Sequence, residues 1–285
     1  MTMRTARFAV DTGLDLVGDV GGDPDAPCVI LMHGGGQTRF SWTSACHTLI
    51  DAGYHVINFD ARGHGESDWA GSGGYSLAYH AADLRKVAEG VRGPVALVGA
   101  SLGGATALRA LADGMQPAAV VLVDIVPNPD PRGVQRIRDF MLARPEGFDS
   151  LEQVADAIAA YNPHRNRPKD LEGLRRNLRL KEDGRFRWHW DPAFLEPDIE
   201  HQRRELAQTV EGARAGRDVP VLLIRGMKSD IVGDEGTAIL RDVMPRLEIF
   251  DVEGAGHMVA GDRNDAFNAG MMQFLVRHFP ASSPA

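Results

Sequence analysis

The stretch "VALVGASLGGATALRA", residues 95–110, joins an apolar run, a serine between glycines and the start of a helical pattern. Gly99, Ser101 and Gly103 match G-x-S-x-G, in which a tight turn between a buried strand and a helix lifts the serine hydroxyl above the sheet. The following helix directs its N-terminal amides at the same point, where an oxyanion would form. The pattern predicts Ser101 as a nucleophile; the alternative is a glycine-rich turn in which Ser101 only caps the helix.

The segments around this turn alternate between short apolar runs and helix-length stretches. The runs are continuous, which is typical of parallel strands covered on both faces. Helix-length stretches begin after Thr38, at Leu77 and after Ser101, and two more are expected near 234–244 and 263–278. This rhythm predicts a doubly wound α/β fold with a mostly parallel sheet. The predicted strands are CVILMH (28–33), HVINFD (55–60), VALVGA (95–100), AVVLVD (119–124), VPVLLIRG (219–226) and LEIFDVEG (247–254).

A helical insertion is expected to interrupt this sheet. The turn-rich "PNPDPRG", which begins at Pro127, is interpreted as a linker, and three helical segments follow it: VQRIRDFML, LEQVADAIAAY and LEGLRRNLRL. The predicted division is a core of residues 1–127 and 211–285 with an insertion of residues 128–210. Within "GRFRWHWDPAFL", an extended chain would place Trp188 and Trp190 on one face and Arg187 and His189 on the other.

Composition narrows the classes of partner. The 285 residues carry a net charge of -8, which argues against a nucleic-acid partner, and the basic cluster at 165–187 is interleaved with acids and reads as a solvated surface. Cys28 and Cys46 form no disulfide framework, and Cys28 is expected in the core. No signal-peptide core or membrane-length apolar run occurs, so we expect a cytoplasmic protein that acts on a small molecule as a monomer or homodimer. The histidines show no metal-type spacing, and no cofactor is predicted.

Three further motifs accompany the serine turn: "LMHGGGQTRFSW" after one strand, "FDARGHGES" after the next, and "GAGHMV" near the end of the chain. With them the chain resembles the α/β-hydrolase family, whose cap domain the insertion also resembles. The resemblance implies that His257 is the catalytic base, and that the amides of Gly35 or Gly36 and of Leu102 form the oxyanion hole.

The resemblance also bears on the other residues of these motifs. It implies that His33 braces the oxyanion loop. Asp60 and Arg62 of "FDARGHGES" are interpreted as holding a turn, and His64 in the same turn is given no chemistry. His189 is expected at the surface, with a substrate contact as the alternative.

The acid that orients His257 has two candidates. The position usual in the family, counted from Gly226, falls on Ser229, and Asp230 lies one residue later. Asp124 ends the strand after the nucleophile helix, at the sheet edge where Ser101 is expected. In one branch of small esterases and amide-cleaving hydrolases the acid follows this strand and a serine takes the usual position, so Asp124 is favoured while Asp230 stays open.

These residues predict a serine hydrolase that cleaves a small ester, thioester or amide through an acyl-enzyme on Ser101. A serine at this position argues against epoxide hydrolase and dehalogenase chemistry, which use an aspartate nucleophile in this family. Candidate substrate contacts are Trp188, Trp190 and Ser229; the two tryptophans alternatively join the insertion to the core. Carbon–carbon bond hydrolysis and perhydrolysis use the same triad and remain alternatives, and a ligand receptor on the same fold is an alternative of another class.

Overall fold

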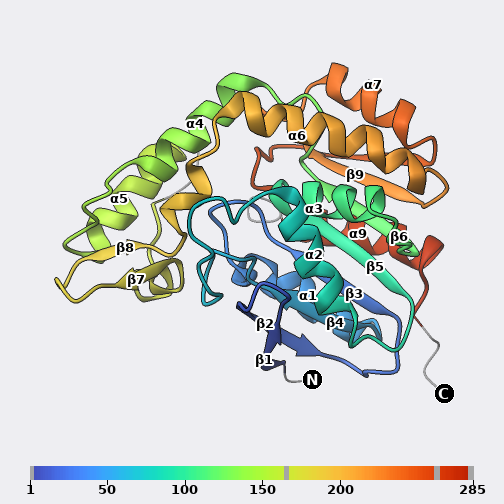
Figure 1. Ribbon diagram of the computed structural model, residues 1–285, viewed down its shortest axis with the longest axis horizontal. Coiled ribbons are helices and arrows are strands. Elements are labelled where there is room, and N and C mark those ends of the chain that lie inside the picture. Colours follow the sequence, from blue (N-terminus) through green and yellow to red (C-terminus); the bar gives the residue numbers. More distant parts are fainter. Residues whose placement is uncertain (1–2, 164–166, 260–263, 282–285) are drawn as a thin grey trace.

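The computed structural model of the chain describes residues 3–163, 167–259 and 264–281. An eight-stranded sheet forms its centre, in the order β1-β2-β4-β3-β5-β6-β9-β10 (Figure 1). Strand β2 runs antiparallel to β1 and β4. The remaining neighbours in this sheet order, from β4 through β3, β5, β6 and β9 to β10, pair in parallel. The strands are β1 (Arg4–Ala9), β2 (Asp15–Gly21), β3 (Cys28–Met32), β4 (His55–Phe59), β5 (Val95–Ala100), β6 (Ala119–Val123), β9 (Val221–Gly226) and β10 (Leu247–Val252).

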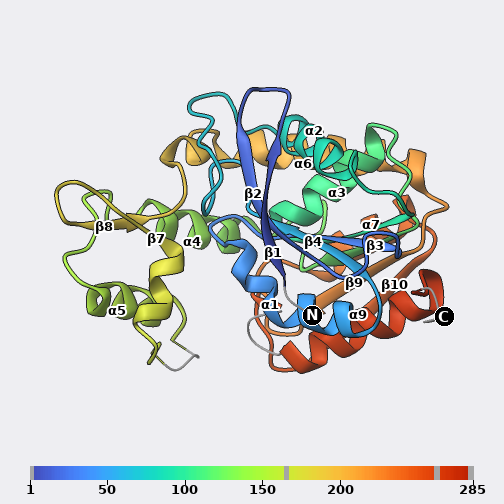
Figure 2. The same ribbon diagram turned by 90° about the horizontal axis from the view of Figure 1, so that it is seen from below.

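The predicted doubly wound fold is confirmed, and both faces of the sheet are covered. Along β3, Val29 and Leu31 pack into one hydrophobic cluster, while Ile30 and Met32 pack into another on the opposite face. This division explains why the strand reads as a continuous apolar run. Figure 2 shows α1 and α9 on one side of the sheet and α2, α3 and α6 on the other. The core helices are α1 (Thr43–Asp51), α2 (Leu77–Ala88), α3 (Leu102–Ala112), α6 (Ile199–Gly212), α7 (Asp234–Val243) and α9 (Asn264–His278).

Each predicted strand and core helix is present, and the two N-terminal strands are additional. Strand β1 lies at the sheet edge with most of its side chains exposed or half-buried, so it lacks the continuous apolar run of the central strands. Cys28 is buried in the core, as expected, and Cys46 is a second buried free thiol. Among the described residues, no helix is both long and apolar enough to cross a membrane.

The inserted segment projects from one side of the core, at the left of Figures 1 and 2. Asp130 caps its first helix, and Pro131 occupies the first turn, where its missing N–H costs no hydrogen bond. The segment "LEGLRRNLRL" is not the predicted helix, because its end pairs with residues 186–188 in a small hairpin. The elements are α4 (Pro131–Leu142), α5 (Leu151–Tyr161), η2 (Glu172–Asn177), β7 (Leu178–Leu180), β8 (Phe186–Trp188) and η3 (Pro192–Leu195), and a short η4 (Ala213–Gly216) follows α6.

Helix α6 falls almost wholly inside the range 128–210 assigned to the insertion, yet it packs with the core. Leu206 and Val210, one helical turn apart, belong to the hydrophobic cluster that covers the sheet beneath α3. The close approach of Gly212 to Ala112 brings the two helices into contact. The insertion's own hydrophobic cluster instead joins α4, α5 and the hairpin, from Met141 to Leu195. Packing therefore separates α6 from the segment before it.

Candidate active site

Ser101 occupies a strained turn between β5 and α3. Its backbone has φ 45° and ψ −108°, a conformation that costs about 1–3 kcal/mol and persists only when its surroundings impose it. A Cβ on Gly99 would lie 2.3 Å from the Gly103 carbonyl carbon, and one on Gly103 would lie 2.3 Å from the Met32 oxygen. Both glycines are thus required by close backbone approach. Ser101 stands at the N-cap position of α3, but its side chain makes no capping hydrogen bond and faces a large cavity, which argues against the alternative in which the hydroxyl only caps the helix.

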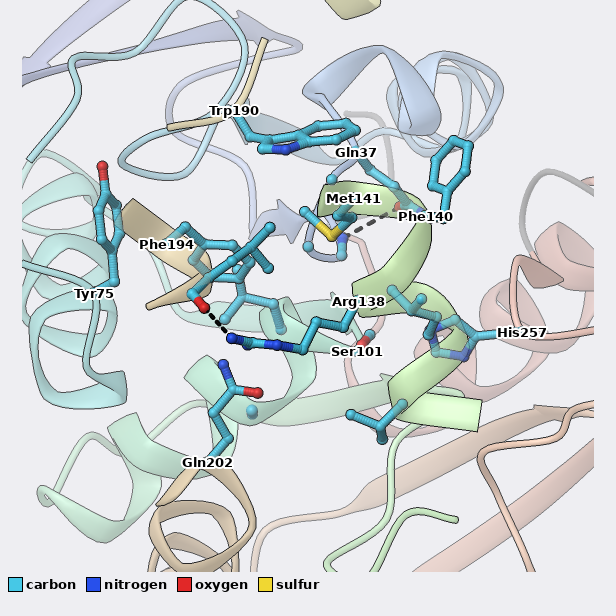
Figure 3. A pocket seen from close by; sticks show the side chains of 18 of the residues that line it. Gln37, Tyr75, Ser101, Arg138, Phe140, Met141, Trp190, Phe194, Gln202 and His257 are labelled. Atoms are coloured by element: carbon cyan, nitrogen blue, oxygen red, sulfur yellow. Dashed lines mark hydrogen bonds between the residues drawn. The ribbon is translucent and has the colours of Figure 1, made fainter. Parts of the chain in front are cut away.

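His257 lines the same cavity as Ser101 (Figure 3), and its ring is hydrogen-bonded to Asp124. The His257 Nδ1 lies 2.7 Å from Asp124 Oδ2, and the Asp124 side chain is fully buried. Two other donors reach this carboxylate: the Gly226 N–H at 3.1 Å and the Ser229 hydroxyl at 2.5 Å. Asp124 itself has φ 51°, directly after the last residue of β6. The structure therefore brings Asp124 to His257.

Asp230 and Ser229 lie elsewhere. The Asp230 carboxylate pairs with the Arg136 guanidinium of α4 at 2.6 Å, on the side of the insertion. Ser229 does not line the cavity, which corrects its assignment as a substrate contact. Its hydroxyl is turned inward, because it donates to Asp124 and accepts the N–H groups of Ile231 and Val232. Ser229 thus closes the turn around the acid.

The glycine loop after β3 presents its backbone to the cavity beside Ser101. The Gly36 N–H donates to His64 Nε2 at 3.1 Å, so this amide is already occupied. In the part of the chain that the structure describes, the Gly35 N–H has no hydrogen-bond partner. Leu102 is the first residue of α3, where N–H groups lack partners within the helix. Of the two glycines predicted for the oxyanion hole, Gly35 is therefore the one whose N–H is available to a ligand.

Buried histidines hold this loop. His33 Nδ1 donates to the Gly34 carbonyl at 2.8 Å and Nε2 accepts the Ala61 N–H at 2.9 Å, as expected for a bracing residue. His64 does more than fill a turn, because it accepts the Gly36 N–H. His189 was expected at the surface, and that expectation is wrong. The residue is 1% exposed, and its ring packs between the rings of His64 and Trp190.

The turn "DARGHGES" has the structural role expected of it. The Asp60 carboxylate accepts the backbone N–H groups of Arg39 and Glu66, and it forms an ion pair with the Arg39 guanidinium. Arg62 binds both carboxylate oxygens of Asp83 at 2.6 Å from inside the core. These bonds fix the loop that carries His64 and Gly65.

Acid destabilisation is expected from these histidines. Burial lowers the pKa of His33 to about 4 and that of His64 to about 3, whereas a histidine in an unfolded chain has a pKa of about 6.5. Below pH 6.5 the unfolded state therefore binds protons at these histidines that the folded state does not bind. The free energy of unfolding should be greatest above that pH and should fall by about 1.4 kcal/mol per pH unit for each ring down to the folded pKa. Urea denaturation at pH 7.5, 6.0 and 5.0 measures this slope, and equal midpoints at all three would contradict it.

The cavity above Ser101 has a volume of about 900 Å³ and lies between the core and the insertion. Its walls are mostly apolar and aromatic, and Figure 3 shows Phe140, Met141, Trp190 and Phe194 among them. The rings of Trp188 and Trp190 stack with centroids 5.0 Å apart. Both tryptophans line the cavity, where a substrate contact stays a prediction, and both belong to the insertion's own hydrophobic cluster rather than to either cluster of the core. Among the described residues, no group of histidine, cysteine and acidic side chains could hold a metal ion.

Comparison with known proteins decides the family. The family model described as the alpha/beta hydrolase family matches residues 29–269. The chain belongs to the alpha/beta hydrolase family. Esterase Rv0045c of Mycobacterium tuberculosis is 32% identical to this hydrolase over 248 residues, 84% of this chain and 79% of the esterase. Protein phosphatase methylesterase 1 of Mus musculus is 29% identical over 162 residues, which cover 54% of this chain and 42% of that protein.

Solved structures agree with this placement of the hydrolase. E-2-(Acetamidomethylene)succinate hydrolase matches with a TM-score of 0.78 and 25% identity, over 96% of this chain and 99% of that one. An alpha/beta hydrolase from Novosphingobium aromaticivorans matches with the same TM-score and 23% identity, over 96% and 98% of the two chains, and supports the fold. The hydrolase is therefore an enzyme, and its relatives include esterases.

Proposed function

We propose that the protein is a serine esterase that cleaves small esters with apolar or aromatic groups through an acyl-enzyme. The observation that carries this proposal is the strained Ser101 turn, which opens on the same apolar cavity as the His257–Asp124 pair. A nucleophile, a base oriented by an acid and a free backbone amide converge there, which is the arrangement that acyl transfer requires.

In the first half of the reaction, His257 acts as the general base. Asp124 accepts the Nδ1–H of His257, so Nε2 carries the lone pair that removes the Ser101 proton. The Ser101 oxygen attacks the ester carbonyl carbon, and the N–H groups of Gly35 and Leu102 stabilise the oxyanion. The imidazolium of His257 then gives its proton to the departing alkoxide, the alcohol leaves, and an acyl group remains on Ser101.

In the second half, water replaces the alcohol. His257 removes a proton from the water as it attacks the acyl carbonyl, and the same two amides hold the second oxyanion. The C–O bond to Ser101 breaks, Ser101 regains its proton from His257, and the carboxylic acid is released. Each step uses side chains and backbone groups of this chain together with the ester and one water molecule.

The substrate class follows from the cavity. Its aromatic and aliphatic walls favour an apolar acyl or alcohol group, since burying such a group is worth about 25 cal/mol per Å². The volume of about 900 Å³ accommodates a small molecule rather than a polymer. The esterase and methylesterase relatives support ester cleavage as the reaction.

The proposal is tested by rapid mixing of the enzyme with 4-nitrophenyl esters of increasing acyl length. An acyl-enzyme predicts a burst of nitrophenolate, close to one equivalent per active site, followed by a slower steady rate wherever deacylation limits turnover. Turnover of matched 4-nitroanilides, thioesters and diketones is measured as well, because the same triad can cleave amides, thioesters and carbon–carbon bonds. No turnover of any ester, with turnover of a diketone or an anilide, would overturn the proposal.

A further inference from the structure

His189 connects the insertion with two glycine loops of the core. Its Nδ1 accepts the Gly65 N–H at 2.7 Å, and its Nε2 lies 3.2 Å from the Gly36 carbonyl oxygen. Because Nδ1 accepts a hydrogen bond, the proton of the neutral ring is on Nε2, which donates to Gly36. One neutral tautomer therefore satisfies both contacts, and the ring is almost completely buried.

The Gly36 contact acts on the peptides of the oxyanion loop. The Gly36 N–H is held by His64 and its carbonyl by His189. The Gly34 carbonyl is held by His33 and also accepts the Gln37 N–H. Since a trans peptide directs its N–H opposite to its carbonyl, the bond to the Gly34 oxygen aims the Gly35 N–H away from His33. The free Gly35 N–H therefore belongs to the peptide whose carbonyl His33 holds, and that carbonyl also accepts the N–H of the Gly36–Gln37 peptide, whose own carbonyl His189 holds.

The two tryptophans that flank His189 in the chain face the cavity rather than the glycine loops. Trp188 and Trp190 stack on each other and line the cavity, whereas His189 between them points to the glycine loops. This alternation is that of an extended chain, in which successive side chains lie on opposite faces. The same three-residue stretch therefore touches both the substrate cavity and the backbone of the oxyanion loop.

We propose that His189 is a positioning residue that couples the seating of the insertion to the placement of the Gly35 amide. Contact between substrate and the Trp188–Trp190 pair holds the stretch in place, and the His189 bond to the Gly36 carbonyl fixes the loop that stabilises the oxyanion. The inference rests on the proposed function, because it assigns Gly35 to the oxyanion hole. It adds that a side chain from the insertion, which touches no reacting atom, sets the rate of the chemical step.

Two substitutions separate the two hydrogen bonds of His189. His189→Gln can place its amide nitrogen where Nε2 stands and keep the bond to Gly36. His189→Asn can place its oxygen where Nδ1 stands and keep the bond from Gly65, but its amide does not reach Gly36. We expect His189→Asn to lower kcat about 10- to 100-fold with KM within about threefold, because removing an oxyanion donor altogether costs about 100- to 1000-fold. We expect His189→Gln to keep kcat within about threefold, since the donor to Gly36 remains.

Arg179→Ala provides the matched control. Arg179 of β7 donates to the carbonyls of Gly65 and Ser67, so its loss also weakens the contact between the hairpin and this core loop without touching Gly36. We expect a lower melting temperature with kcat nearly unchanged. A trifluoromethyl ketone, which forms a tetrahedral adduct with Ser101, should lose affinity in His189→Asn in parallel with kcat and should keep it in Arg179→Ala.

The kcat, KM and inhibitor affinity of each variant are compared with those of the wild type. Turnover of an activated ester that disappears in Ser101→Ala establishes the proposed function independently of His189. Given that result, equal losses of kcat in His189→Asn and His189→Gln, or an equal loss in Arg179→Ala, would show a general docking role and overturn the inference. Circular dichroism and melting curves of each variant confirm that the rates compare folded proteins.

Discussion

Ser101→Ala is expected to lower kcat/KM for 4-nitrophenyl esters by about 10⁴-fold or more, because the covalent pathway needs the hydroxyl oxygen. The turn itself should persist. The Ser101 side chain makes no capping bond to the helix, and the glycines on either side set the close backbone contacts. We therefore expect a melting temperature within a few degrees of the wild type, and activity assays with melting curves measure both quantities.

An exposed serine supplies the control for this variant. Ser44 lies at the surface on α1, and Ser44→Ala should keep full activity. The variant is expressed and purified separately, so that no wild-type enzyme contaminates it. If Ser101→Ala then retained more than a tenth of the wild-type rate, Ser101 would not be the nucleophile.

Asp124→Asn is expected to lower kcat by about 10³- to 10⁴-fold with little change in KM, because an amide nitrogen facing His257 Nδ1 stabilises the wrong tautomer of the ring. The substitution removes no volume from the buried site. Asparagine can still accept the Gly226 N–H through its oxygen, so the fold should survive. Steady-state and single-turnover kinetics of the purified variant measure the loss.

Asp230→Asn is the matched comparison, since it makes the same chemical change at the neighbouring candidate. It removes the ion pair with Arg136, in which both side chains are partly exposed, and such pairs are worth about 0–1 kcal/mol. We expect kcat within about threefold of the wild type. A large loss in Asp230→Asn with near-normal turnover in Asp124→Asn would reassign the acid.

The sequence predicts the parts of this site that depend on local pattern. The turn around Ser101 needs Gly99 and Gly103 at fixed spacing, and the continuous apolar run before it identifies the strand. The acid is harder to identify from the sequence, because Asp124 ends one predicted strand and Asp230 lies just after another. Only the three-dimensional turn, with Asp124 at φ 51° and Ser229 bonded behind it, distinguishes the two.

Other features depend on contacts between distant segments. Strand β1 is amphipathic and lies at the sheet edge, so it lacks the apolar run that identifies the central strands. The segment 171–180 has a helical composition, but pairing with residues 186–188 turns its end into a strand. His189 reads as an ordinary surface histidine until the hairpin packs it against Gly36 and Gly65. Long-range packing overrides local preference in each of these cases.

Covalent labelling tests the central claim of an acyl-enzyme nucleophile most directly. The wild type is incubated with a fluorophosphonate carrying an apolar chain, and its intact mass and peptide map are measured. The account predicts one adduct per chain, located on Ser101, with no adduct in Ser101→Ala and slow labelling in Asp124→Asn. An adduct on another residue, or an unlabelled wild type that still hydrolyses esters, would contradict it.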